Sequence, residues 1–342
     1  TREDKISDIS FLDDFSGATG NATDPLGNGW QYGSTALANV SVVDGKILKM
    51  SVSSGANSAN DRLVRPVSEA KINQVVSVDF DSADFGYYGS NTSNNTQNRP
   101  RVLARVKNNP ANSGNVTAYT ADIEWGVSYK INAIVNGSLT NIYKSTEKPT
   151  KPTSGTYRLV LVAEQTNTTT TTLTIKYYET TNGVETLIHS HTITDATEAL
   201  QGAGTAGIQI AGNNTGIKYS GFSYLGTDEG NSIPNIILND LELSAGNIDF
   251  DSEKYVYDVN VDNAVSEIKV RPTATLENAV ITVDGKTVAS GEESSAIALE
   301  AGVTKKINIK VTKGVFESKT YVINVTREDK ISDISFLDDF SG

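Results

Sequence analysis

The sequence lacks cysteine altogether and contains only two histidines among its 342 residues. The absence of cysteine excludes disulfide bonds, thiolate metal ligands and thiol nucleophiles. The two histidines, His189 and His191, are separated by one residue on an expected strand and therefore share a face. A zinc site needs three or four ligands, and no third histidine is present to complete one. We expect the pair to be exposed polar residues of a strand.

Positive charge is also scarce, since 29 Lys and Arg stand against 41 Asp and Glu and the formal net charge is −12. Nucleic acids and anionic lipid surfaces bind clustered Lys and Arg, so neither is an expected partner. No apolar run approaches the roughly 18 to 20 residues that a membrane span requires, and no signal peptide begins the sequence. The abundant Asn, Thr, Ser and Gly are typical of secreted bacterial β-domains, which predicts an extracellular or cell-surface location.

Helical periodicity is almost absent. Short runs rich in Val, Ile, Thr and Tyr alternate with polar residues, as in QVVSVDF (74–80), TYRLVLVAE (156–164) and TYVINVT (320–326). This period of two predicts an all-β fold. Asp284-Gly285 lies between two such runs, as do Asp44-Gly45 and Asn182-Gly183, and these pairs predict tight hairpin turns. The stretch ATEAL (196–200) permits one short helical turn.

The first seventeen residues, TREDKISDISFLDDFSG, recur unchanged at residues 326–342, an offset of 325. A period of this size belongs to whole domains rather than to the short repeats of solenoids. We interpret the chain as one copy of a long tandem repeat followed by the start of the next. Overlapping ends and a permuted unit are the alternatives, and both still presuppose a parent protein with repeats.

The composition changes near residue 226, where a strand passes into the Gly, Asp, Asn and Pro of TDEGNSIPN (227–235). We expect residues 1–5 to be the tail of a preceding repeat, 6–226 a large domain, 227–235 a linker and 236–330 a small domain. Residues 331–342 are then expected to be the first strand of the next repeat.

The downstream segment resembles the cadherin-like β-sandwich domains of bacterial surface proteins. The resemblance rests on LNDLELSAGNI (238–248), FDSEKYVYDVNV (250–261) and the ending TKKINIKVTKGVFESKTYVINVTRE (304–328). It implies a small immunoglobulin/cadherin-like β-sandwich that acts as a spacer, and the calcium motifs of cadherins are missing. We expect one end of its core to contain Phe250, Tyr255, Val256 and Val259, and the inward face of the last strand to contain Tyr321, Ile323 and Val325.

The upstream segment resembles the concanavalin-like jelly rolls of the laminin-G and legume-lectin type. The residues that carry the resemblance are FLDDFSG (11–17), Gly29-Trp30, SVVDGKILKMSV (41–52) and the closing strand IKYSGFSYLG (217–226). In that family the first and last strands pair, which implies that Phe11 and Phe15 lie near Phe222 and Tyr224. A structural calcium is often held at this place, and the implied ligands are Asp13, Asp14, Asp24 and Asp228.

The stretch TADIEWG (120–126) is similar to the Glu-x-Asp-x-Glu strand of laminarinase-type glycoside hydrolases. Asp122 and Glu124 match its second and third positions, but Thr120 stands where the nucleophile is required and cannot form a glycosyl intermediate. We therefore expect no enzymatic activity. Two carboxylates on a solvated strand face, or a degenerate glycan site, are the interpretations that remain.

A long loop, DFGYYGSNTSNNTQNRPRV (84–102), offers aromatic rings and planar polar groups of the kind that bind sugars. Its alternative role is to cover the edge of the sandwich. Trp30 is a further aromatic candidate. The candidate glycan-binding residues are Tyr87, Tyr88, Asn91, Asn95, Arg99, Asp122, Glu124 and Trp125.

These features predict a non-catalytic tandem-repeat unit of a very large secreted or cell-surface bacterial protein, acting as an adhesive stalk or fibre and requiring no cofactor. A carbohydrate-binding module of a polysaccharide-degrading system is the alternative. Neighbouring repeats and a glycan are the expected partners. Residues 331–342 are expected either to be disordered or to lie on a neighbouring molecule in place of its residues 6–17, because an unpaired apolar strand seeks a partner. The second case would give head-to-tail assembly by strand donation. The residues expected to make this contact are Ile331, Ile334, Phe336, Leu337 and Phe340.

Overall fold

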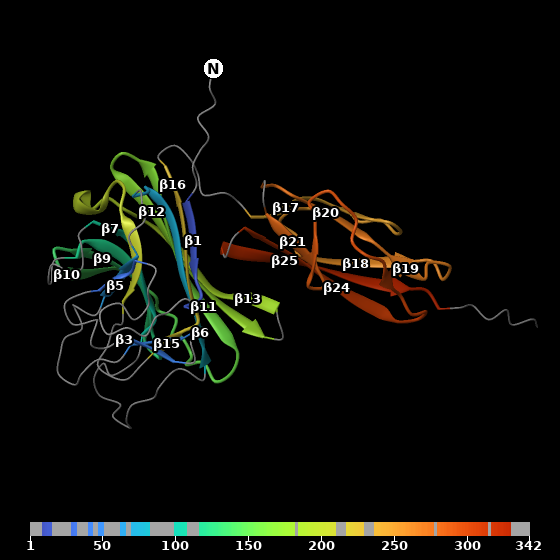
Figure 1. Cartoon of the computed structure of the whole chain (residues 1–342), viewed down its shortest axis with the longest axis horizontal. Helices are drawn as coiled ribbons and strands as arrows, with labels where there is room; N and C mark the ends of the chain where they lie inside the picture. The colour runs from blue at the N-terminus through green and yellow to red at the C-terminus, as the bar shows by residue number, and fades with distance from the viewer. Residues whose placement is uncertain are drawn as a thin grey trace, which may run out of the picture. The chain divides into compact units, whose positions relative to one another are not determined.

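The computed structural model divides the chain into two compact units, residues 1–233 and 234–342. The structure describes residues 9–15, 29–32, 40–43, 47–50, 62–65, 70–82, 99–107, 116–181, 184–209, 217–228, 236–276, 279–313 and 316–329. These residues form strands and one 3-10 turn, η3 (Glu198–Leu200), within the ATEAL stretch. The fold class predicted from the sequence, all-β, is confirmed (Figure 1).

The first unit is built from two large antiparallel sheets, named here sheet A and sheet B. In order, the strands of sheet A are β1 (Ile9–Asp13), β16 (Gly221–Thr227), β6 (Asn73–Asp81), β11 (Thr156–Asn167), β12 (Thr170–Thr181) and β13 (Val184–Asp195). The strands of sheet B are β10 (Ser138–Lys144), β9 (Ser128–Val135), β8 (Ala118–Glu124), β7 (Arg101–Val106), β14 (Thr205–Gln209), β5 (Arg62–Arg65) and β2 (Gln31–Tyr32).

A third, small sheet belongs to the same unit and contains β15 (Ile217–Tyr219), β4 (Ile47–Met50) and β3 (Val40–Val43). The hydrophobic core draws on both large sheets, with Val78 and Leu161 from sheet A and Val102 and Ile131 from sheet B, all fully buried. Every second residue of a strand points to the same face, so each sheet contributes one apolar face to this core. Two sheets packed in this way are a β-sandwich.

The first and last strands of this unit pair, as the resemblance to concanavalin-like jelly rolls implied. β1 runs antiparallel to β16, with Phe11 opposite Tyr224 and Asp13 opposite Phe222. The rings of Phe11 and Phe222 have centroids 6.3 Å apart. This pairing places β1 at the end of sheet A.

The second unit is a smaller sandwich. Its largest sheet contains β18 (Val256–Val261), β25 (Phe316–Arg327), β24 (Thr304–Lys313), β21 (Val280–Val283) and β22 (Lys286–Val288). Two further strand pairs are β17 (Leu238–Leu243) with β20 (Val270–Ala274), and β19 (Glu267–Ile268) with β23 (Ile297–Ala298). Asp284 and Gly285 join β21 to β22 with φ values of 46° and 79°, which confirms the tight turn predicted there.

The core of the second unit corrects one sequence prediction. Tyr321, Ile323 and Val325 are fully buried, as expected for the inward face of β25. Val256, however, is 52% exposed, whereas Val259 is buried. Positions 256 and 259 differ by an odd number, so a strand of period two cannot place both side chains on one face.

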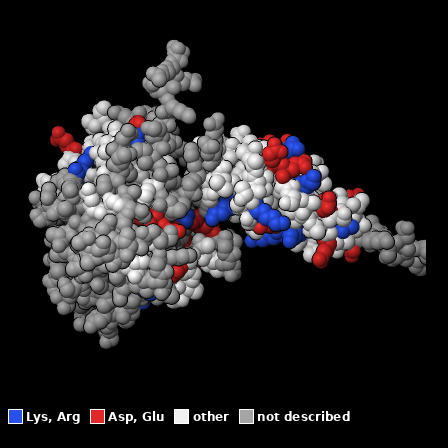
Figure 2. All heavy atoms as spheres, in the orientation of Figure 1, with Lys and Arg blue, Asp and Glu red and all other residues white. Residues whose placement is uncertain are grey.

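Charge is dispersed over the second unit. Figure 2 shows basic and acidic side chains close together on its visible face. Two ion pairs of this unit join Glu293 to Lys269 and to Arg271, each at 3.1 Å. Exposed ion pairs of this kind contribute little to folding, and their main effect is to keep the surface soluble.

Candidate functional site

The polar face of strand β8 is the candidate site. On this strand Tyr119, Ala121 and Ile123 belong to the hydrophobic core. Thr120, Asp122 and Glu124 therefore lie on the opposite face of sheet B. The exposed fractions of Asp122 and Glu124 are 0% and 6%, so the interpretation of two carboxylates on a solvated strand face is wrong.

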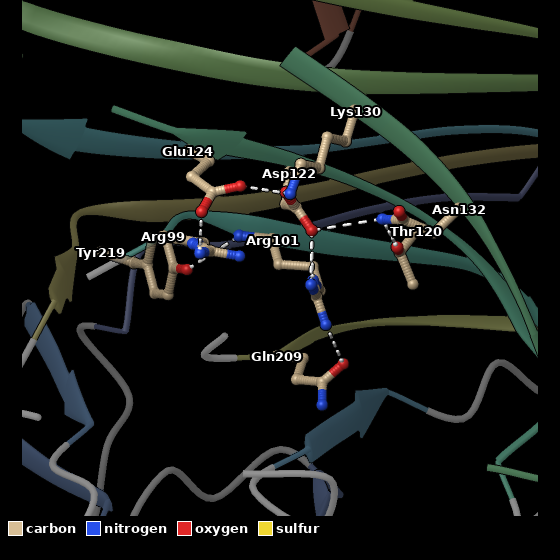
Figure 3. Close-up of polar contacts among 9 residues, drawn as sticks. All are labelled: Arg99, Arg101, Thr120, Asp122, Glu124, Lys130, Asn132, Gln209 and Tyr219. Atoms are coloured by element: carbon tan, nitrogen blue, oxygen red, sulfur yellow. Dashed lines mark hydrogen bonds and ion pairs between the residues drawn. The ribbon is translucent and has the colours of Figure 1, made fainter. Parts of the chain in front are cut away.

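Asp122 is held by a cation from the neighbouring strand. Arg101 lies directly opposite Asp122 in the β7–β8 register. Its Nε donates to Asp122 Oδ2 at 2.9 Å, and a second guanidinium nitrogen also contacts this oxygen. The guanidinium reaches Gln209 Oε1 at 3.2 Å, at the end of β14 (Figure 3). Both members of the ion pair are buried, so the pair is shielded from the screening effect of salt.

Glu124 makes contact with two cations. Arg99 pairs with its Oε1 and Lys130, on β9, with its Oε2. Together with the Arg101–Asp122 pair, the network contains three cationic and two anionic side chains on three adjacent strands and the segment before β7 (Figure 3). Thr120, Asn132, Gln209 and Tyr219 add neutral groups around it.

Asn132 links the network to Thr120. Its Nδ2 donates to Thr120 Oγ1 at 2.9 Å and to Asp122 Oδ2 at 3.2 Å. Asn132 Oδ1 and Asp122 Oδ1 are buried, and among the described residues neither oxygen has a hydrogen-bond donor. Buried acceptors nearly always find a donor, from protein, water or a bound molecule. Both side chains are 0% exposed, so a hydroxyl donor from outside could reach these two acceptors only if the residues around them moved apart.

Tyr219, on β15, closes one side of the network. Its hydroxyl accepts a hydrogen bond from the Arg101 backbone N–H at 3.3 Å. Burial raises the pKa of this hydroxyl, so it stays neutral at physiological pH.

The structure separates several predicted site residues. Trp125 is 5% exposed and packs edge-on against Tyr177 with ring centroids 6.0 Å apart, so it belongs to the core and not to the polar face. Trp30 is likewise buried in the core. Of the predicted loop residues, Arg99 joins Asp122 and Glu124 in the network. The predictions for Tyr87, Tyr88, Asn91 and Asn95 lie outside the described residues.

The implied calcium ligands do not form one group among the described residues. Asp13 is buried and accepts hydrogen bonds from Trp30 Nε1 at 2.8 Å and from the Phe15 N–H at 2.7 Å. Asp228 pairs with Lys71 at 3.0 Å, and Asp14 is exposed. Asp24 lies outside the described residues. Within the described ranges no three His, Cys, Asp or Glu side chains are grouped as metal ligands, and calcium stays a prediction.

The two histidines are not simply exposed, which corrects the sequence interpretation. His189 is buried, and its ring stacks on Tyr129 with centroids 3.9 Å apart. Its Nδ1 lies 2.7 Å from Glu147 Oε2. His191 stacks in the same way on Tyr143, at 3.8 Å. The two pairs connect β13 of sheet A to β9 and β10 of sheet B, at the ends of the two sheets.

These contacts predict that acidification weakens the jelly roll. The pKa of His191 is lowered, first by burial and second by the neighbouring His189. The unfolded chain keeps a pKa near 6.5 and binds the proton more readily, so stability is unaffected above about pH 6.5 and falls below it. His191→Gln should lose less thermal stability than the wild type between about pH 7 and pH 5, measured by circular dichroism. Identical pH dependence of both proteins would refute this role.

Comparison with known protein families supports the description of the second unit. Residues 238–328 match the family model described as "Cadherin-like beta sandwich domain". No curated protein sequence matches the chain. In the described part of the structure no helix has the length and hydropathy needed to cross a membrane.

Similar solved structures have low sequence identity. The β-glucanase of Bacillus licheniformis is 13% identical, with 63% of this chain and 97% of that chain covered and a TM-score of 0.37. The Ca²⁺-bound exoplasmic/lumenal domain of VIP36 is 11% identical, with 66% and 91% covered and a TM-score of 0.40. The PL-14 alginate lyase of Aplysia kurodai is 8% identical, with 65% and 98% covered and a TM-score of 0.39. By its own topology the first unit is a two-sheet antiparallel β-sandwich whose first and last strands pair, and residues 238–328 of the second unit match the cadherin-like family model.

Proposed function

We propose that this chain is a non-catalytic, polysaccharide-binding unit of an extracellular repeat protein, in which the cadherin-like sandwich is a spacer. The observation that carries the proposal is the network of charged and amide side chains on the polar face of β8, which includes Asp122 Oδ1 and Asn132 Oδ1 as acceptors without a donor among the described residues. A buried acceptor without a donor costs about 1–3 kcal/mol. The hydroxyl groups of a sugar are donors of the right kind to recover this free energy once the side chains that bury the two acceptors move to admit them.

The arrangement of the carboxylates favours binding over hydrolysis. A retaining glycosidase needs a carboxylate nucleophile and a carboxylic acid placed on either side of the scissile bond. Thr120 occupies the position of the nucleophile, and its hydroxyl accepts from Asn132. Asp122 and Glu124 are both engaged with cationic side chains. Such a face can form hydrogen bonds with hydroxyl groups, but Asp122 and Glu124 are not a free pair of carboxyls for catalysis.

The test is binding to a panel of neutral and uronic-acid-containing polysaccharides by affinity electrophoresis. Asn132→Leu removes one of the two acceptors and should weaken binding about tenfold, the effect of one lost hydrogen bond. Thr192→Ala is the matched control, because Thr192 is exposed on β13 and its Oγ1 contacts Thr174 Oγ1 at 2.9 Å, remote from the network. Thermal unfolding checks that both variants are folded.

Two outcomes of this binding experiment would contradict the proposed function. If Asn132→Leu binds polysaccharide as tightly as the wild type, the polar face of β8 is not the binding site. If the wild type binds none of the polysaccharides in the panel, the result favours the second candidate function, a stalk or adhesive unit without a glycan ligand. That candidate is supported by the exact recurrence of residues 1–17 at 326–342 and by the spacer-type sandwich.

A further inference from the structure

Strand β1 occupies a position beside β16 at the end of sheet A, and another strand could take this position. We name this position the seat of β1. β1 is the end strand of the sheet, and among the described strands it pairs with β16 alone. Five residue pairs join them, from Ile9–Gly226 to Asp13–Phe222. A strand bonded along one side can be replaced by another strand of the same sequence without breaking any other pairing of the sheet.

Side chains at the end of β1 make the seat specific. Phe15 is fully buried, and its ring centroid lies 6.3 Å from that of Trp30. The Asp13 carboxylate accepts from both the Phe15 N–H and Trp30 Nε1. Phe15 has a φ of 58°, a conformation that bulky residues rarely adopt, and these contacts hold it there. Another strand must therefore present an aspartate and a phenylalanine at the same spacing to fill the seat.

The chain contains a second segment with these residues at the same spacing. Residues 334–340, ISFLDDF, are identical to residues 9–15. In this copy Asp338 corresponds to Asp13 and Phe340 to Phe15. The contacts described for Phe11, Asp13 and Phe15 are therefore also open to residues 334–340 of another molecule, and the two segments differ only in how they are tethered.

We propose that the seat on β16 binds residues 334–340 of a second copy of this chain, which links molecules head to tail. The released β1 of the acceptor then leaves the sheet, as in donor-strand exchange. The tether gives β1 an effective concentration of about 1 mM at its own seat. At about 10 μM protein, the second copy should then occupy about one seat in a hundred. A substitution that weakens the binding of β1 to its seat, and leaves residues 334–340 unchanged, must therefore shift the equilibrium from monomers toward assemblies.

The decisive variants compare Phe15→Ala with Phe15→Ala/Phe340→Ala in the full chain. Truncating a fully buried phenylalanine weakens the docked strand about 100-fold or more, so at about 10 μM a large share of the seats of Phe15→Ala should pass to the intact copy. Multi-angle light scattering after size exclusion should show species above monomer mass that increase with concentration. The double variant weakens both strands equally and should return to the monomer. Phe15→Ala/Asp339→Ala is the matched control and should still assemble, because Asp339 corresponds to the exposed Asp14.

A peptide measurement separates exchange from aggregation. A synthetic peptide of residues 326–342 should dissolve the Phe15→Ala assemblies, and the same peptide with Phe340→Ala should not. Equal mass distributions for Phe15→Ala and Phe15→Ala/Phe340→Ala would overturn the proposal, including the case in which both variants misfold. So would assemblies that resist the unmodified peptide.

Discussion

Replacement of Arg101 by methionine is expected to lower the free energy of unfolding of the jelly roll by about 3–5 kcal/mol. The guanidinium is the principal cation of Asp122, whose carboxylate is fully buried. Methionine fills much of the same volume but leaves the carboxylate without its cation and Gln209 Oε1 without this donor. An uncompensated buried charge costs far more than the loss of packing around it. Urea unfolding followed by tryptophan fluorescence measures the effect, because both tryptophans, Trp30 and Trp125, lie in this unit.

The double variant Arg101→Met/Asp122→Leu should recover most of the lost stability. Replacing a buried ion pair with apolar residues of similar size is often neutral or even stabilising. Arg271→Met is a suitable control, since Arg271 is 46% exposed in the second unit and its ion pairs lie in water. A single Arg101→Met variant as stable as the wild type would contradict the description of the pair as buried.

The same double variant separates stability from binding. It keeps the fold, yet it removes Asp122 Oδ1, one of the two acceptors assigned to the glycan. If the network serves ligand binding, the double variant should unfold at a urea concentration close to that of the wild type and still bind polysaccharide at least tenfold more weakly. A stable double variant that binds normally would restrict the network to a structural role.

The network was only partly predictable from the sequence. Asp122 and Glu124 stood out because they match a known strand motif, whereas Arg101, Lys130 and Asn132 were not singled out. A local signal for them exists: Arg99 and Arg101 are two residues apart, as are Lys130 and Asn132 in the otherwise apolar SYKINAIV. Polar residues at alternate positions of successive strands indicate a shared polar face. The pairing of Arg101 with Asp122 depends on strand register, which the sequence alone does not determine.

The aromatic residues show a similar limit. The proximity of Phe11 to Phe222 and Tyr224 followed from the resemblance to jelly rolls and is confirmed. The assignment of Trp125 to the sugar site failed, because Trp125 follows Glu124 directly and so points to the core. His189 was expected to be exposed, but the contacts between β13 and β9 bury it against Tyr129. Periodicity predicts which residues share a face, and the packing of the two sheets decides how deeply each face is buried.

Tyr321 should be the most sensitive position of the cadherin-like sandwich. It is fully buried, and its ring lies between Phe250 and Tyr255, with centroid distances of 5.7 Å and 5.3 Å. Its hydroxyl donates to Ser252 O at 2.9 Å and accepts the Leu238 N–H at 3.1 Å. Tyr321→Ala removes both the ring and the two hydrogen bonds, and we expect a loss of about 3–5 kcal/mol. Tyr321→Phe keeps the ring and should cost about 1–3 kcal/mol.

Hydrogen exchange measured by mass spectrometry on the full chain can assign this loss to one unit. Peptides from residues 236–329 should lose protection in Tyr321→Ala, while those from the jelly roll should keep theirs, because each unit has its own core. Val256→Ala is the control on the same sheet, since Val256 is 52% exposed, and it should leave protection unchanged. Tyr321→Phe could instead lower the free energy of unfolding as much as Tyr321→Ala does. In that case the two hydrogen bonds of the hydroxyl, and not the packing of the ring, would hold β17 and the segment before β18 against β25.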